Sequence, residues 1–266
     1  MKKRVSILSV TVVIVLALSF LLVGNSFAAP PGDKTGNFDK IVFVHYPKGI
    51  PAKGGIPGPP SSGGDSGKAW YKYGGIHWTN AAIPVHYRVG SGVAADFLNG
   101  IQASFQTWED DPDSYIDFEY DIATFLGAPS SFSGSGSMNG ANEVAWVSLS
   151  ASDTNAIAIT VVWYNTLSGL IAEVDMGMNS DLAWSQTTLA AGTDPDSVTG
   201  DTGSYDVQTI ATHEAGHWLM LGDMYNKPAA EQTMFGYGAK GELKKRSLES
   251  GDLAGLRLIY SGATIP

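Results

Sequence analysis

The sequence predicts an α+β domain that begins near residue 69 and fills the rest of the 266-residue chain. A strand-like segment at 83–89, an apolar helical pattern at 94–110 and an alternating segment at 115–120 form the first unit. Three more strand-like segments follow: 143–149, 156–164 and 171–179. The chain then changes to helical patterns at 207–221 and 250–262.

The individual elements are supported by where their apolar residues recur. One face of the 94–110 helix collects four large apolar residues: Phe97, Ile101, Phe105 and Trp108. Segment 156–164 is apolar on both faces, which is typical of a covered central strand. Asp206 or Ser204 can cap the start of the 207–221 helix, because their side-chain oxygens can accept from its first free N–H groups.

The first 28 residues have the pattern of an export signal. Basic residues at 2–4 precede an apolar run at 5–23, and Ser26, Phe27 and Ala28 form a small-x-small cleavage site. We therefore predict cleavage after Ala28 and a secreted, extracellular protein. The alternative is an uncleaved membrane anchor, because the run approaches the roughly 20 apolar residues that span a bilayer.

Residues 29–68 read as a prosegment or a linker. More than half of residues 47–68 are Gly or Pro, a composition that cannot bury a core. Before them, the segment 40–46 is apolar enough for a single strand. The predicted division is therefore a signal peptide at 1–28, a prosegment or linker at 29–68 and one folded domain at 69–266.

Charge and cysteine content narrow the possible partners. The formal net charge of -10 argues against nucleic acid or an anionic membrane as a partner, since both attract basic surfaces. The chain has no cysteine, which excludes disulfides and thiolate ligands, so any metal must be held by His, Asp, Glu or backbone oxygen. We expect a monomer without membrane contact once the signal is removed.

The stretch HEAGHWLMLGD at 213–223 predicts a metal site. His213 and His217 are four residues apart, so on a helix their rings lie on one face and can bind one zinc ion. Glu214 then stands beside the metal, where it can take a proton from a water whose pKa zinc lowers to about 7. The alternative is a helix with two partly buried histidines that bond to backbone groups.

A catalytic zinc site needs a third protein ligand. The other histidines, His45, His77 and His86, all precede the motif and do not extend it. The candidates are one aspartate and three glutamates: Asp223, Glu231, Glu242 and Glu249.

The motif resembles HExxHxxGxxH/D, the signature of the metzincin metalloproteases, with aspartate last as in the snapalysin group. His213, Glu214, His217 and Asp223 fall on its positions. Met234 resembles the family's Met-turn methionine. Segment 246–262 resembles the closing helix of the matrixin branch, and 83–110 resembles the start of matrixin catalytic domains, so the likeness spans about 70–262.

This resemblance implies a secreted zinc endopeptidase that hydrolyses protein or peptide substrates. Zinc would be held by His213, His217 and Asp223, with Glu214 as the catalytic general base. The implied fold is a twisted, mostly parallel five-stranded sheet with one antiparallel edge strand, an active-site helix, and a small C-terminal subdomain with a Met-turn and a final helix.

Two departures from the family pattern matter. Met220 stands at the family's glycine, yet the helix must break before Asp223, because an unbroken helix would turn Asp223 away from the metal. We predict either a turn shifted to Gly222 or a strained Met220.

The second departure concerns the prosegment. Matrixin prosegments usually block zinc with a cysteine, which is absent here. Latency would need another group, such as His45 or a leader aspartate, and the alternative is a strand or tether without an inhibitory role.

Two rival functions and one further ion remain open. A thermolysin-like enzyme would take its third ligand from a downstream glutamate, for which Glu242 is best placed. A non-enzymatic rival is an extracellular binding protein whose zinc is structural or whose site is inactive. Oxygens for Ca²⁺ could come from four aspartates before the motif helix: Asp194, Asp196, Asp201 and Asp206.

Overall fold

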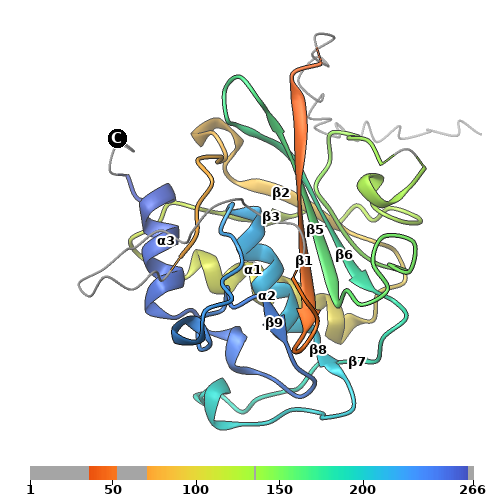
Figure 1. The fold of residues 1–266 in the computed structure, drawn as a ribbon, viewed down its shortest axis with the longest axis vertical. Coiled ribbons are helices and arrows are strands. Elements are labelled where there is room, and N and C mark those ends of the chain that lie inside the picture. The colour runs from red at the N-terminus through yellow and green to blue at the C-terminus, as the bar shows by residue number, and fades with distance from the viewer. Residues whose placement is uncertain (1–35, 53–70, 135, 263–266) are drawn as a thin grey trace, which may run out of the picture.

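A computed structural model describes residues 36–52, 71–134 and 136–262 (Figure 1). The predicted signal peptide at 1–28 and most of the Gly/Pro-rich stretch lie outside these residues. Within the described part of the chain, no helix has the length and apolar character needed to cross a membrane.

A mixed, mostly parallel sheet of seven strands forms the centre of the fold (Figure 1). Its strands, in spatial order, are β3 (Phe118–Tyr120), β2 (Val85–Val89), β4 (Glu143–Val147), β6 (Ile171–Asn179), β5 (Ala158–Asn165), β1 (Phe38–Pro47) and β9 (Tyr237–Gly238). The first four run parallel, β5 is antiparallel to both of its neighbours, and β9 is parallel to β1. Two short parallel strands, β7 (Trp184–Ser185) and β8 (Tyr205–Asp206), form a separate pair.

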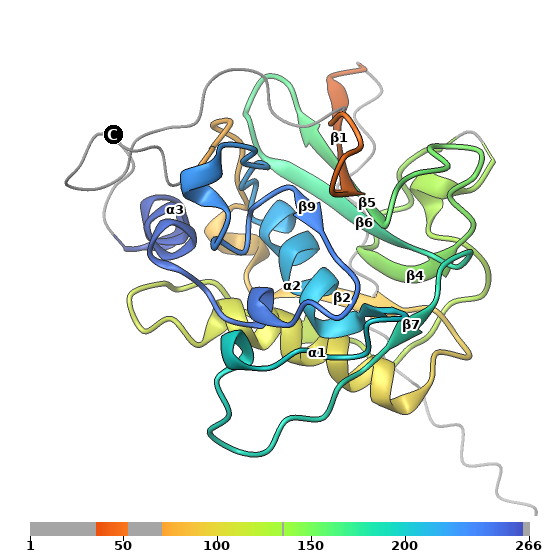
Figure 2. The ribbon, with the colours of Figure 1, turned by 60° about the horizontal axis from the view of Figure 1, so that its bottom comes forward.

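Within the described ranges, three α-helices accompany the sheet (Figures 1 and 2). They are α1 (Ala95–Glu109), α2 (Val207–Trp218) and α3 (Ser250–Tyr260). Short 3-10 turns occur at Asn80–Ala82, Ser130–Phe132, Pro195–Ser197, Lys227–Ala229 and Lys244–Arg246. Helices α1 and α2 pack on each other, and both contact the sheet: α1 lies against β3 and α2 lies against β5.

The structure confirms the α+β class at this level and refines several boundaries. The strand and helix predicted at 83–110 are present, as is the strand at 171–179. The predicted strand at 115–120 is reduced to 118–120, because the N–H of Tyr115 instead donates to the carbonyl of Tyr260 at the end of α3 (2.8 Å). On α1, Ile101, Phe105 and Trp108 are buried in the main core as their spacing predicted.

The expectation of a five-stranded sheet with an antiparallel edge strand is wrong for the described residues, because their main sheet has seven strands and the antiparallel β5 lies inside it. Strand β5 is antiparallel, but β1 covers its outer edge in a register that runs from Phe38 opposite Asn165 to His45 opposite Ala158. The single strand predicted at 40–46 is therefore real and belongs to the main sheet. Part of the segment assigned to a prosegment or linker shares the domain's core, since Phe43 packs in its largest cluster.

Candidate metal centre

Helix α2 is held firmly at its start and along its length. Asp206 caps it by accepting from the N–H of Thr209 (2.9 Å), which selects the aspartate from the two predicted caps. Arg246 forms a buried ion pair with the same aspartate, and the indole N–H of Trp108 donates to the carbonyl of Thr212 (2.9 Å). The one-turn spacing of the motif histidines is therefore built into a rigid element.

The motif helix also needs its glycine. A Cβ on Gly216 would lie 2.2 Å from Sδ of Met234 and 2.8 Å from the ring of Trp108, too close for either contact. Met234 thus packs directly against the helix backbone between the two histidines. The buried carboxylate of Asp252, on α3, accepts from the N–H groups of Thr233 (2.7 Å) and Met234 (3.0 Å), which fixes this turn beneath α2.

Both motif histidines are oriented by backbone carbonyls. Nδ1 of His213 lies 2.7 Å from the carbonyl of Thr233, and Nδ1 of His217 lies 2.7 Å from that of Leu221. Because a carbonyl only accepts, each Nδ1 carries the proton and donates it. Each Nε2 is then unprotonated and has a lone pair that can bind a metal.

Helix α2 ends at Trp218, before Asp223, as the motif requires. Of the two predicted alternatives, the structure shows the strained Met220, whose φ of 62° is the only positive value at a non-glycine residue in the described chain. Gly222 does not adopt a positive φ. The sharp turn brings Oδ1 of Asp223 to 3.1 Å from Nε2 of His213 and 3.6 Å from Nε2 of His217.

The three alternative glutamates lie elsewhere. Glu231 is exposed and pairs with Lys244, Glu242 accepts from the N–H of Ala239, and Glu249 caps α3. In the described residues, Asp223 is the only carboxylate that shares an ion-sized group of ligand atoms with both motif histidines, and a second such group joins His213 to His45 and Glu214.

The chemistry of this donor set fits a cation. His213, His217 and Asp223 are almost fully buried. Burial lowers the pKa of both histidines, that of His217 to about 3, so the rings are neutral and able to ligate, while burial raises the pKa of Asp223. Nε2 of His217 has no hydrogen-bond partner. A metal ion such as zinc would satisfy this orphaned nitrogen and offset the burial of the carboxylate.

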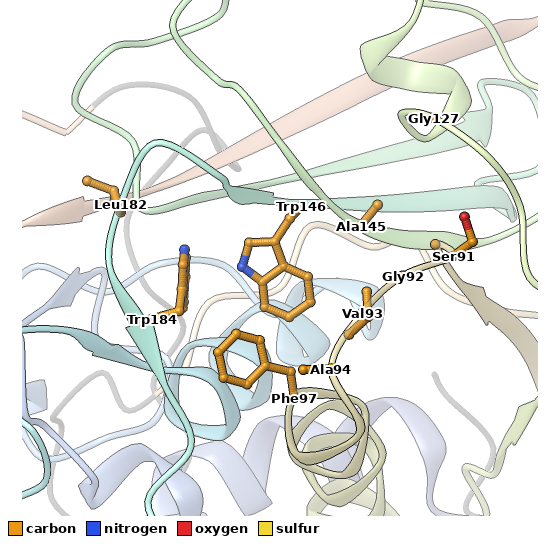
Figure 3. A pocket seen from close by; sticks show the side chains of 11 residues that line it. Ser91, Gly92, Val93, Ala94, Phe97, Gly127, Ala145, Trp146, Leu182 and Trp184 are labelled. Carbon is orange, nitrogen blue, oxygen red and sulfur yellow. The ribbon is translucent and has the colours of Figure 1, made fainter.

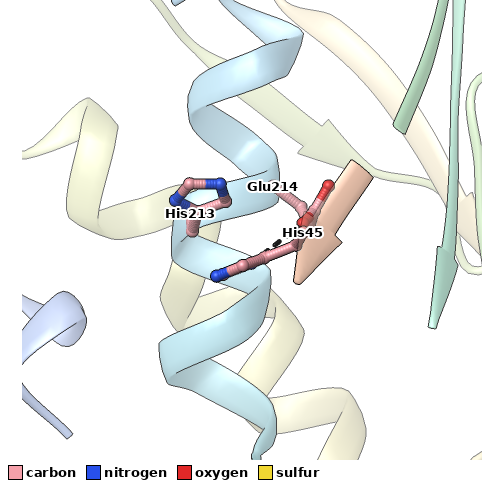
Figure 4. A group of neighbouring side chains, drawn as sticks. All are labelled: His45, His213 and Glu214. Atoms are coloured by element: carbon pink, nitrogen blue, oxygen red, sulfur yellow. Dashed lines mark hydrogen bonds and ion pairs between the residues drawn. The ribbon is translucent and has the colours of Figure 1, made fainter. Parts of the chain in front are cut away.

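Glu214 faces the sheet beside these ligands (Figure 4). Its Oε2 accepts from the hydroxyl of Thr160 on β5 at 2.6 Å, and its Oε1 lies 3.2 Å from Nδ1 of His45 on β1. Burial raises the pKa of Glu214 to about 8. A carboxyl group with such a raised pKa can both accept and return a proton near neutral pH.

Sequence patterns missed Thr160, Phe43 and Lys245. Lys245 is fully buried, and its ammonium donates to the carbonyls of Phe235 and Tyr237. Burial lowers its pKa to about 8. It sits within a short basic run, which ordinarily indicates a solvated surface, so no local pattern indicated this position.

The aspartates considered for Ca²⁺ do not come together as an ion site. Asp206 pairs with Arg246, Asp201 accepts from Gly203 and Ser204, and Asp194 caps a 3-10 turn. Among the described residues, the ligand groups close enough to share an ion all lie at α2.

A separate cavity of about 440 Å³ lies between the start of α1, strand β4 and β7 (Figure 3). The rings of Phe97, Trp146 and Trp184 project into it. No titratable side chain lines it, so it offers no group for acid, base or metal chemistry.

Comparison of the sequence with known families and with curated proteins returns no match to either. The case for a function therefore depends on the residues and their geometry.

Proposed function

We propose that this protein is a secreted zinc-dependent endopeptidase of the metzincin type, matrixin-like with aspartate as the third zinc ligand. The observation that carries the proposal is the convergence of the two unprotonated Nε2 atoms of His213 and His217 with the Asp223 carboxylate, beside Glu214. The turn at Met220, where metzincins have glycine, is what brings the carboxylate to the histidines.

The arrangement of the elements supports the same proposal. From β2 to β6 the chain gives four parallel strands and the antiparallel β5, the sheet that the resemblance implies. Met234 lies under the motif helix against Gly216, and α3 closes the chain. These features suit the expected Met-turn and final helix.

In the proposed reaction, zinc when bound supplies Lewis-acid activation of water and polarisation of the scissile carbonyl. Oε1 of Glu214 takes the proton of the attacking water and later delivers it to the leaving amine. The hydroxyl of Thr160 holds Oε2 and thereby orients the carboxylate. The outer edge of β5 pairs with the extended strand β1, and its backbone groups could pair with an extended peptide in the same way once β1 is displaced. This mode of binding suits a protein or peptide substrate.

The test is hydrolysis of casein by the whole chain and by a chain cut specifically within 53–68, so that the covering strand β1 can be displaced. Each is measured with and without a zinc chelator, and after zinc is returned. We expect activity that the chelator abolishes and zinc restores. Glu214→Gln, matched in size, should reduce kcat by roughly 10²–10⁴ while zinc remains bound.

Unchanged hydrolysis in Glu214→Gln, or none in a zinc-loaded and cut wild type, would contradict the proposal. The second result would favour the non-enzymatic alternative, a binding protein with structural zinc. Zinc content measured beside activity separates loss of the metal from loss of the base.

A further inference from the structure

Strand β1 lies directly over the proposed catalytic site. The ring of Phe43 stacks on that of His217 with centroids 4.0 Å apart, and the ring of His45 lies 3.9 Å from that of His213 (Figure 4). With the strand in place, His213, Glu214 and His217 are 0% exposed. No substrate can reach these groups while β1 occupies this position.

The strand is held as an extended peptide would be held in a groove. On one side it pairs antiparallel with β5 over eight residue pairs. On the other side Tyr46 and Pro47 pair parallel with Tyr237 and Gly238 of β9. A Cβ at Gly238 would lie 3.1 Å from Nε2 of His45, so glycine leaves room for the imidazole.

His45 also engages the group proposed as the general base. Its Nε2 lies 3.2 Å from the ammonium of Lys245, which in its charged form has only protons to donate, so Nε2 accepts. Nδ1 then carries the ring proton and donates it to Oε1 of Glu214 (3.2 Å). Thr160 already occupies Oε2. Both carboxylate oxygens therefore already have a hydrogen-bond partner, and His45 is the partner of Oε1, the oxygen proposed to take the proton from water.

The two faces of β1 have different surroundings. Phe43 and His45 face α2, whereas Val44 and Tyr46 belong to a second apolar cluster on the other side of the sheet. The hydroxyl of Tyr46 donates to the carboxylate of Asp153 (2.8 Å). The strand is thus anchored by one face while the other covers the site.

We propose that residues 38–47 are an internal inhibitor that occupies the peptide groove between β5 and β9 and holds the general base through His45. This inference rests on the proposed function and specifies how the same site is regulated. It requires no cysteine, in agreement with a chain that has none. Release of the strand opens the groove and frees Oε1 of Glu214.

The test places a site-specific protease sequence within 53–68 of the full chain and compares the intact and cut forms at nanomolar concentration. A covalent tether keeps the strand at an effective concentration near millimolar, and dilution after the cut removes this advantage. We expect hydrolysis of a quenched peptide to rise at least about tenfold after the cut, equivalent to about 1.4 kcal/mol. A synthetic peptide of residues 36–52 should reverse the rise.

Substitutions in the uncut chain provide a second, independent test. Phe43→Ala combined with His45→Ala should activate the tethered protein, whereas Val42→Ala, on the opposite face of β1, is the matched control and should not. Binding of the fluorescein-labelled 36–52 peptide to the cut protein, followed by anisotropy, reports docking without activity. We expect the doubly substituted peptide to bind at least about tenfold more weakly than the unsubstituted one.

Equal activity of intact, cut and doubly substituted chains would overturn the inference and leave the proposed function standing. Docking of the labelled peptide without hydrolysis by any zinc-loaded form would instead overturn the proposed function. Equal activation by Val42→Ala and by the Phe43 and His45 pair would also overturn the inference, because the effect would then come from loosening of the sheet.

Discussion

The strained turn at Met220 leads to an unusual stability prediction. Its φ of 62° lies in the left-handed region, and its side chain is fully buried. Met220→Ala and Met220→Gly both remove the buried side chain, at a cost of about 2–5 kcal/mol. Their difference therefore isolates the backbone. An alanine at this φ retains a strain of roughly 1–2 kcal/mol that glycine lacks, whereas glycine loses roughly 0.5–1 kcal/mol more chain entropy.

The net expectation is that the glycine variant is more stable than the alanine variant by about 0.5–1 kcal/mol. Urea unfolding of both zinc-free variants, followed by tryptophan fluorescence, measures the difference. The adjacent Leu219 is the matched control, since it is equally buried but has an ordinary φ of -91°. There alanine should be the more stable. An alanine advantage at Met220 as well would refute the strain argument.

Three further predictions concern the rest of the fold. Gly216→Ala should destabilise the protein by about 1–3 kcal/mol in urea unfolding, because its Cβ would clash with Sδ of Met234; a change below the error of the assay would contradict that contact. Burial raises the pKa of Glu173 from 4.5 to about 7. The folded protein therefore favours the neutral side chain, and this contribution to the free energy of unfolding is fully present below pH 4.5 and is lost as pH rises through 7. Glu173→Gln should flatten this decline, and an unchanged slope between pH 5 and 8 would count against it. Hydrogen bonding from Arg257 lowers the pKa of Asp111 below 3.8, so the carboxylate stabilises the fold above that pH and the effect disappears as pH falls through its folded pKa. Asp111→Asn should therefore reduce stability at pH 7 and make acid unfolding less steep, and equal acid unfolding curves would refute the assignment.

Features that depend on local spacing could be predicted from the sequence. The apolar spacing of 94–110 predicted α1, and the one-turn spacing of His213 and His217 predicted that their rings share a helix face. The need to break the helix before Asp223 limited the turn to two possibilities, one of which the structure shows at Met220. Such features require only helix geometry and backbone sterics.

Features that depend on distant partners could not be predicted. The apolar run at 40–46 indicated a strand but contained no information about its neighbour, which lies more than a hundred residues away on β5. The burial of Lys245 depends on backbone carbonyls of Phe235 and Tyr237, and these groups have no sequence pattern. The sequence therefore offered His45 as a group that could provide latency, but only the pairing of β1 with β5 places its ring against Glu214.

Zinc titration calorimetry on the metal-free full chain tests the identity of the metal centre most directly. We predict one zinc per chain, bound with similar affinity by the wild type and by Glu242→Ala, and at least roughly 100-fold more weakly by Asp223→Ala. Glu242→Ala is the control, because that side chain accepts from the backbone of Ala239 away from the histidines. Tight binding retained by Asp223→Ala and lost in Glu242→Ala would contradict the proposed ligand set.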